Sequence, residues 1–111
     1  FANINAPLFN WVIENLVNNA FNAIKDDKGY IRLSVIKHEK DIFIDVEDSG
    51  MGITKGNQKT IFMPGFTTRK RGWGLGLSLA KRIIEEYHKG KIYVKESKLG
   101  EGTKFRIELK S

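Results

Sequence analysis

Three glycines at alternate positions open the most informative stretch of the chain. Gly72, Gly74 and Gly76 follow a basic triplet at residues 69–71, and a helical pattern of apolar residues begins directly after them. Glycine lets the backbone approach a ligand closely, and a helix N-terminus offers unpaired N–H groups with a partial positive charge. This arrangement can hold phosphate. The glycines alone are equally compatible with a purely structural junction between a loop and a helix.

Four asparagines on one predicted helix could hold a metal ion. Asn15, Asn18, Asn19 and Asn22 are spaced i, i+3, i+4 and i+7, so they share one face, opposite the apolar stripe. Asparagine is a mediocre helix former, so four of them on one face are unusual. The amide oxygen suits Mg²⁺, which takes few protein ligands and keeps phosphate and water oxygens as the others. The alternative is an exposed asparagine-rich face without a ligand.

An acidic turn follows the second predicted strand. Asp48 ends that strand, and Gly50, Gly52 and Ile53 come directly after it. A carboxylate at a strand end beside two glycines is well placed to accept a hydrogen bond from the exocyclic amine of adenine. The alternative is an Asx turn, in which Asp48 binds its own backbone.

The segment before the glycines could form a lid. Phe62 and Phe66 are apolar anchors in an otherwise polar loop, and Thr67, Thr68 and Arg69 add hydroxyls and a cation that could contact phosphate. The alternative is a surface loop that the two phenylalanines hold against the core.

Helical and alternating apolar patterns predict the elements that position these residues. We expect helices over Leu8–Lys25 and Gly74–Tyr87, and strands over Tyr30–Lys37, Asp41–Glu47, Lys91–Glu96 and Thr103–Leu109. Residues 48–72 are predicted to be irregular. The order of helix, two strands, long loop, helix and two strands indicates an α+β fold, with helices on one face of a mixed sheet.

Length and composition set limits on function. The 111 residues form a single predicted domain, residues 1–111, with a net charge of +6 that favours an anionic ligand. The absence of cysteine excludes disulfides and thiolate metal sites, and with two histidines we expect no histidine-based zinc site. The basic residues are spread along the chain, so we do not expect nucleic-acid binding. No apolar run approaches the roughly 20 residues that span a bilayer, and we expect no membrane insertion.

Taken in order, the four segments resemble the N, G1, F and G2 boxes of one domain family. Residues 14–20, 48–53, 62–69 and 72–78 are similar to these boxes in the catalytic ATP-binding domain of bacterial sensor histidine kinases. That domain belongs to the GHKL superfamily, with gyrase, the ninety-kilodalton heat-shock chaperone and the mismatch-repair ATPase. The resemblance covers residues 8–109. It implies a two-layer α/β sandwich of the Bergerat type, with ATP between the helix layer and a lid.

The resemblance also implies roles for individual residues. Asn19 would coordinate Mg²⁺, and Asn15 would line the same site one turn earlier. Asp48 would bind the adenine amine, and Arg69 would lie near the γ-phosphate. Asn15 and Arg69 are the implied catalytic residues. The whole implied nucleotide site comprises Asn15, Asn19, Asn22, Asp48, Gly50, Gly52, Ile53, Phe62, Thr67, Thr68, Arg69, Gly72, Gly74, Leu75, Gly76 and Leu77. Trp73 departs from the family pattern, which has a small residue between the first two glycines. Asn22 departs as well, because the family often has a charged residue there.

The position four residues before Asn19 indicates transfer rather than hydrolysis. ATP-hydrolysing relatives have a glutamate there as general base toward water, whereas this chain has Asn15, whose amide does not take a proton. Glu14 points about 100° away around the helix. The resemblance therefore implies phosphoryl transfer to a histidine on a separate dimerisation domain. We expect structural roles for His38 and His88.

The same resemblance implies the setting of the domain. We expect a monomeric cytoplasmic domain of a homodimeric parent, with a response regulator receiver domain downstream, whether or not the parent carries a membrane anchor. Three alternatives remain open. The chain could be an ATP-hydrolysing conformational clamp, an anti-sigma-type serine kinase, or a degenerate domain that serves only as a docking surface.

Overall fold

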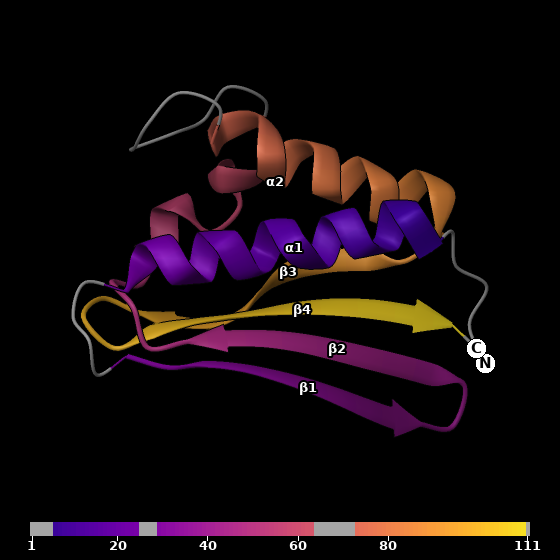
Figure 1. Cartoon of the computed structure of the whole chain (residues 1–111), viewed down its shortest axis with the longest axis horizontal. Helices are drawn as coiled ribbons and strands as arrows, with labels where there is room; N and C mark the ends of the chain where they lie inside the picture. Colours follow the sequence, from indigo (N-terminus) through magenta and orange to yellow (C-terminus); the bar gives the residue numbers. More distant parts are fainter. Residues whose placement is uncertain (1–5, 25–28, 64–72, 111) are drawn as a thin grey trace.

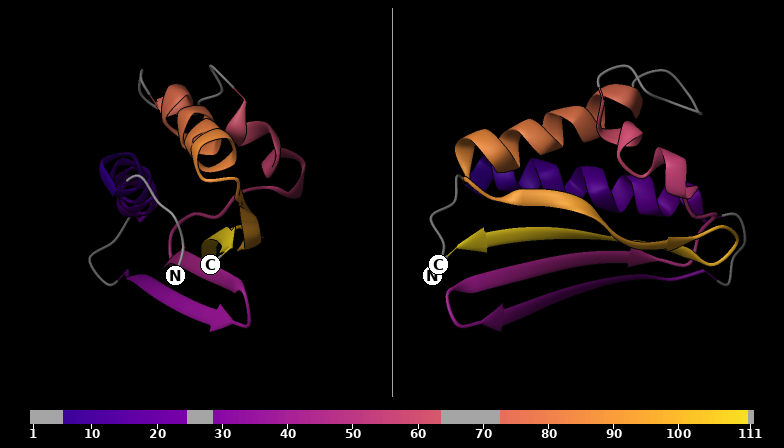
Figure 2. Two further views of the ribbon diagram at one scale, coloured as in Figure 1. Left: turned by 90° about the vertical axis from the view of Figure 1, so that its right-hand side faces the viewer. Right: turned by 180° about the vertical axis from the view of Figure 1, so that it is seen from behind.

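The computed structural model describes residues 6–24, 29–63 and 73–110, the last range without the side chains of residues 73–75. In these residues two helices lie on one face of a four-stranded sheet (Figures 1 and 2). The elements are α1 (Ala6–Ala23), β1 (Ile31–His38), β2 (Asp41–Asp48), α2 (Trp73–Arg82), β3 (Lys91–Lys98) and β4 (Gly102–Lys110). The 3-10 turns Lys55–Asn57 and Thr60–Phe62 lie between β2 and α2, and a π-helical turn, Ile83–Tyr87, continues α2.

The two-layer α+β architecture is confirmed, but the prediction of a mixed sheet is wrong for the described strands. The strand order is β1-β2-β4-β3, and each neighbouring pair is antiparallel. The connection through α2 does bring β3 into the same direction as β2, as expected for a helical crossover. However, β4 turns back from β3 and takes the place between them, so β2 and β3 form no parallel ladder.

The apolar stripe of α1 forms the centre of the core. Phe9, Val12, Leu16 and Ala20 are buried on this helix, at the helical spacings seen in the sequence. They pack with buried residues of the sheet and of the α2 layer, which are Val46, Ile61, Phe62, Ala80, Ile83, Ile84, Ile92, Phe105, Ile107 and Leu109. This packing fixes the rotation of α1 about its axis. It thereby decides which of the asparagines point toward the neighbouring elements.

All predicted helices and strands are present, with ends shifted by no more than two residues. The second predicted helix changes from α to π geometry at Ile83, and the Gly90 N–H then donates to the Ile84 carbonyl at 2.9 Å. This bond closes the end of the helical segment before β3. His88 is buried there, where its Nδ1 lies 3.0 Å from the Ile83 carbonyl oxygen and its ring meets Phe9 edge to face. A structural role for His88 agrees with these contacts.

An ion pair ties the two central strands together on the side of the sheet away from the helices. The Arg106 guanidinium donates to both carboxylate oxygens of Asp45, at 2.8 and 2.9 Å, and lies over the Phe43 ring. The hydrogen bond to Asp45 raises the pKa of Arg106 above its usual value. The Asp45 side chain is only 5% exposed, so this pair is held in a largely desolvated place.

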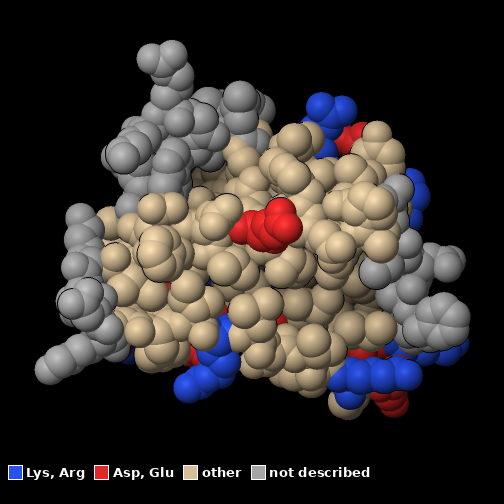
Figure 3. All heavy atoms as spheres, viewed as in Figure 1, with Lys and Arg blue, Asp and Glu red and all other residues tan. Residues whose placement is uncertain are grey.

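Charged side chains are unevenly distributed over the surface. On the face shown in Figure 3, which has α1 in front, Lys and Arg lie in separate groups toward the margins and most of the middle is uncharged. Among the described residues no helix is both long and apolar enough to cross a bilayer. The positive charge therefore does not form one continuous patch over the described part of this face.

Candidate functional site

A cavity of about 270 Å³ lies between the C-terminal half of α1, the turn after β2 and the start of β4. It brings together five of the residues predicted from the sequence: Asn19, Asp48, Gly52, Ile53 and Leu77. The other lining residues are Ala23, Met51, Thr54, Asn57, Ile61, Leu99, Thr103 and Phe105. Most of these are apolar, with a few polar groups among them, as is typical of a small-molecule site.

Asp48 supplies a buried carboxylate to this cavity. Its residue is 3% exposed, and the Gly50 N–H donates to Asp48 Oδ1 at 2.8 Å. The Asx turn that was the alternative to ligand binding is therefore present. The two roles are compatible, because a carboxylate has about four lone-pair sites and the turn bond occupies one of them. The turn holds the carboxylate at the edge of the cavity.

The loop after Asp48 is fixed by backbone bonds on both sides. The Met51 N–H donates to the Ala23 carbonyl at 3.0 Å, at the end of α1, and the Gly100 N–H donates to the Met51 carbonyl at 2.8 Å. Gly52 has a φ of +79°, and a Cβ built on it would lie 2.2 Å from the Lys98 carbonyl oxygen. The loop is thus held between α1 and the β3–β4 turn, at a distance that only glycine allows.

Two further glycines allow the backbone of neighbouring segments to lie equally close together. A Cβ on Gly50 would lie 2.6 Å from the Ala23 carbonyl oxygen, and a Cβ on Gly102 would lie 2.0 Å from the Asp48 carbonyl oxygen. Gly50 is buried but does not line the cavity. Its described contacts are with the end of α1, so its lack of a side chain serves backbone packing in this structure.

Asn19 combines a place in the cavity lining with a buried side-chain atom that has no partner among the described residues. Its side chain lines the cavity, and among the described residues its Nδ2 is buried without a hydrogen-bond partner. Such groups are rare in folded proteins. The nitrogen and oxygen of an amide are assigned rather than distinguished, so the unpaired end can be either a donor or an oxygen ligand. A phosphate oxygen, a water or a metal ion would satisfy it.

The donor set around Asn19 fits a metal that takes most of its ligands from elsewhere. The described residues contain no group of three or more His, Asp or Glu side chains that could hold an ion by themselves. One amide oxygen, with phosphate and water oxygens as the other ligands, suits Mg²⁺. Zn²⁺ and Ca²⁺ would require more protein ligands.

The other predicted asparagines lie outside the cavity lining. Asn15 packs against Gly76 of α2, where a Cβ on Gly76 would lie 2.6 Å from Asn15 Oδ1. Asn22 is exposed, and its Nδ2 donates to the Asn18 carbonyl at 2.8 Å. The four asparagines of the predicted face therefore differ in their surroundings. Asn19 lines the cavity, Asn15 lies where the two helices cross, and Asn18 and Asn22 are exposed.

The remaining predicted residues are only partly described. Phe62 is buried and meets the Phe105 ring edge to face, with ring centroids 6.0 Å apart, so it anchors its segment in the core rather than lining the cavity. Gly74 and Leu75 lie in the first turn of α2, and their side-chain environment is not described. Thr67, Thr68, Arg69 and Gly72 lie outside the described residues.

Sequence reasoning missed the part of the cavity that β4 and the turn before it supply. Thr103 is 6% exposed and pairs with Asp48 across the β2–β4 ladder, and Leu99 lies in the turn before it. The signal available in the sequence was the pair Gly100 and Gly102 around one residue. It indicated a turn, but not which strand that turn would meet.

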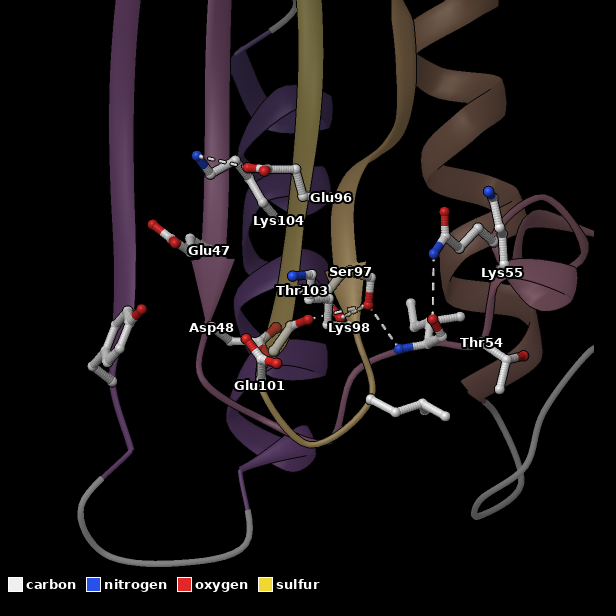
Figure 4. Close-up of a pocket in the computed structure, with 15 residues that line it drawn as sticks. Glu47, Asp48, Thr54, Lys55, Glu96, Ser97, Lys98, Glu101, Thr103 and Lys104 are labelled. Carbon is white, nitrogen blue, oxygen red and sulfur yellow. Dashed lines mark hydrogen bonds and ion pairs between the residues drawn. The ribbon is translucent and has the colours of Figure 1, made fainter.

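A larger groove of about 790 Å³ adjoins the cavity (Figure 4). The two share Asp48, Ile53, Thr54, Leu99 and Thr103. Beyond these residues the groove is lined by charged side chains of both signs, including the Lys104–Glu96 ion pair at 3.6 Å. We assign the site to the smaller cavity, because it contains Asn19 and its buried unpaired amide group.

The sequence profile of the histidine kinase-, DNA gyrase B- and HSP90-like ATPases matches residues 5–111 of the chain. Sporulation kinase E of Bacillus subtilis (strain 168) is 39% identical over 99 residues, which are 88% of this chain and 13% of that protein. The signal transduction histidine-protein kinase AtoS of Escherichia coli (strain K12) is 40% identical over 108 residues, which are 96% of this chain and 17% of that protein. The chain thus spans less than a fifth of these two relatives.

Solved structures show the same fold. The catalytic domain of the histidine kinase ThkA superposes with a TM-score of 0.84 at 33% sequence identity. The match covers 96% of this chain and 69% of that catalytic domain. The arrangement of helices and sheet described above is therefore that of a histidine kinase catalytic domain.

Gly52 and Gly100 offer a matched test of the loop packing, because both have a φ of +79°. We expect Gly100→Ala to lower the free energy of unfolding by about 1 kcal/mol, from the left-handed backbone alone. Gly52→Ala should lower the free energy of unfolding by at least about 2 kcal/mol more than Gly100→Ala does, because the new Cβ would clash with the backbone carbonyl of Lys98. Urea denaturation of both variants measures the difference. Equal losses would show that the Gly52 contact with Lys98 does not matter for stability.

Proposed function

Because the chain belongs to the family of histidine kinase-, DNA gyrase B- and HSP90-like ATPases, we propose that it binds Mg·ATP in the Asn19–Asp48 cavity. We propose further that it presents the γ-phosphate to a histidine on a separate dimerisation domain. The observation that carries this proposal is that Asn19 and Asp48, from separate elements, line one cavity, with a buried unpaired amide group at Asn19.

The Asp48 end of the cavity suits adenine. A carboxylate accepts hydrogen bonds, and the exocyclic amine of adenine donates them. The apolar side chains of Met51, Ile53, Leu77 and Leu99 line the same cavity and offer surface for the flat faces of the base. Asp48 is well buried, so a hydrogen bond to it would form away from competing water.

The Asn19 end suits the phosphates and their metal. The Asn19 amide would give Mg²⁺ one oxygen ligand, and bound Mg²⁺ would neutralise charge on the phosphate groups. We propose that Thr67, Thr68, Arg69, Gly72 and the first turn of α2 complete the phosphate site. The start of a helix adds N–H groups and a partial positive charge that favour an anion.

The surroundings of Asn15 favour transfer over hydrolysis. Its amide does not act as a general base, and it packs on Gly76 outside the cavity lining. His88 is buried against Phe9 and the Ile83 carbonyl, which is unsuitable for a phosphoacceptor. We therefore place the acceptor histidine on another domain of a cytoplasmic, homodimeric parent kinase, which would pass the phosphate to a response regulator.

Asp48→Asn should weaken the binding of ATP by more than tenfold. The substitution removes a charged acceptor and places an amide donor near the donor amine, and a hydrogen bond to a charged group contributes roughly 1.5–3 kcal/mol. Isothermal titration calorimetry measures the change in Kd. Asp41→Asn, on the same strand at the exposed hairpin end, is the matched control and should bind like the wild type. Unchanged affinity in Asp48→Asn would exclude Asp48 from the base site.

Asn19→Ala should abolish the dependence of ATP binding on Mg²⁺. In the wild type we expect ATP to bind more tightly with Mg²⁺ than with EDTA, and without the amide the two affinities should converge. Asn18→Ala, an adjacent exposed residue, serves as the control and should keep the wild-type dependence. If Asn19→Ala showed the same Mg²⁺ dependence as the wild type, the metal would be held elsewhere.

The chain with Mg·ATP should release inorganic phosphate very slowly, because position 15 carries an amide in place of the general base of the hydrolysing relatives. Asn15→Glu introduces the residue that ATP-hydrolysing relatives have at this position, with a side chain one methylene longer than that of Asn15, and should increase phosphate release, since a positioned base contributes up to about 10²–10⁴-fold. A continuous phosphate assay measures both rates. Rapid release by the wild type would instead favour an ATP-hydrolysing clamp.

A further inference from the structure

Ser97, near the end of β3, connects this strand to the loop after β2 and to the start of β4. Its hydroxyl lies 2.7 Å from the Ile53 nitrogen, 2.8 Å from Thr103 Oγ1 and 3.1 Å from the Gly102 carbonyl oxygen. Figure 4 shows Ser97 beside Thr103, with dashed lines marking these interactions. Ser97 lines the larger groove but not the smaller cavity, so it acts on the cavity through its neighbours.

The number of available hydrogens determines the direction of each bond. A serine hydroxyl has one hydrogen to donate and two lone pairs to accept. The Ile53 N–H can only donate to Ser97, and the Gly102 carbonyl can only accept from it. All three contacts can be hydrogen bonds at the same time only when Ser97 donates its single hydrogen to Gly102 and Thr103 donates to Ser97.

When Thr103 donates its hydroxyl hydrogen to Ser97, the Thr103 oxygen can only accept hydrogen bonds from a ligand in the cavity. Thr103 has one hydroxyl hydrogen, and Ser97 takes it, so what Thr103 Oγ1 still offers is its lone pairs. Thr103 lines the cavity, is 6% exposed, and faces Asp48 in the β2–β4 register. The cavity wall at this point thus consists of two acceptors side by side, one charged and one neutral.

We propose that Ser97 is a positioning residue that sets the polarity of the Thr103 hydroxyl and thereby favours a purine with an amino group at position 6. Such a base presents a donor to the acceptor wall. A purine with a carbonyl at position 6 presents an acceptor there, and would leave buried acceptors facing each other. The proposal rests on the proposed function, because it concerns the nucleotide of the Asn19–Asp48 cavity.

Binding of Mg·ATP and Mg·ITP, which differ only at position 6 of the base and the adjacent N1 hydrogen, tests this role. The wild type should prefer ATP. Ser97→Ala frees the Thr103 hydrogen to turn toward the ligand, and the ratio of the two Kd values should fall by roughly three- to tenfold, as expected for one hydrogen bond. Both affinities should also decrease, because the Ile53 N–H loses its acceptor. The ratio is therefore the decisive measurement.

Two variants separate positioning from a general structural effect. Ser97→Thr keeps the hydroxyl and should restore the wild-type ratio, while Ser34→Ala, a serine of β1 that lines neither the cavity nor the groove, should leave it unchanged. If Ser97→Ala weakened the binding of ATP and ITP equally, so that the ratio of their Kd values stayed unchanged, the proposal would be overturned. If the wild type bound neither nucleotide, the proposed function itself would fail.

Discussion

The site depends on the close backbone contact between the loop after β2 and the elements on either side of it. Gly50 and Gly102 allow the loop to lie against the end of α1 and the start of β4, and Gly52 lies against the Lys98 carbonyl. Two backbone hydrogen bonds through Met51 hold this arrangement. A side chain at any of these glycines would push the loop away from its neighbours. The position of Asp48, and with it one end of the cavity, therefore follows from backbone geometry.

The same principle operates at the crossing of the two helices. The absence of a side chain at Gly76 lets α2 approach α1 closely enough to contact the Asn15 amide. Glycine in a helix costs about 1 kcal/mol relative to alanine, so a glycine retained there must serve packing or function. In this structure Gly76 serves packing between the two helices. The phosphate role predicted for Gly72, Gly74 and Gly76 stays a prediction.

The sequence predicted the helices and strands well. It predicted poorly which strands lie next to each other. Periodicity located both helices and all four described strands, because apolar spacing reflects burial directly. Asn19 and Asp48 were predicted as site residues because each belongs to a local pattern, and both line the cavity. Thr103 and Ser97 were missed, because their importance comes from pairing across β2, β4 and β3 rather than from neighbours in sequence. The prediction of a mixed sheet was wrong for the same reason, because no local signal in the sequence places β4 between β2 and β3.

The buried amide of Asn19 is a local cost to the stability of α1. An unpaired buried polar group costs roughly 1–3 kcal/mol, whereas burying a side chain such as Leu16 or Val12 contributes about 1.5–3 kcal/mol. The apolar stripe of the helix can therefore support one unpaired group on its flank without loss of the fold. A ligand that supplies the missing partner would remove that cost, so part of the binding free energy would come from relieving a defect already present in the folded chain. If Asn19 has the role proposed above, a residue with satisfied hydrogen bonds at this position would make the free domain more stable and weaken nucleotide binding.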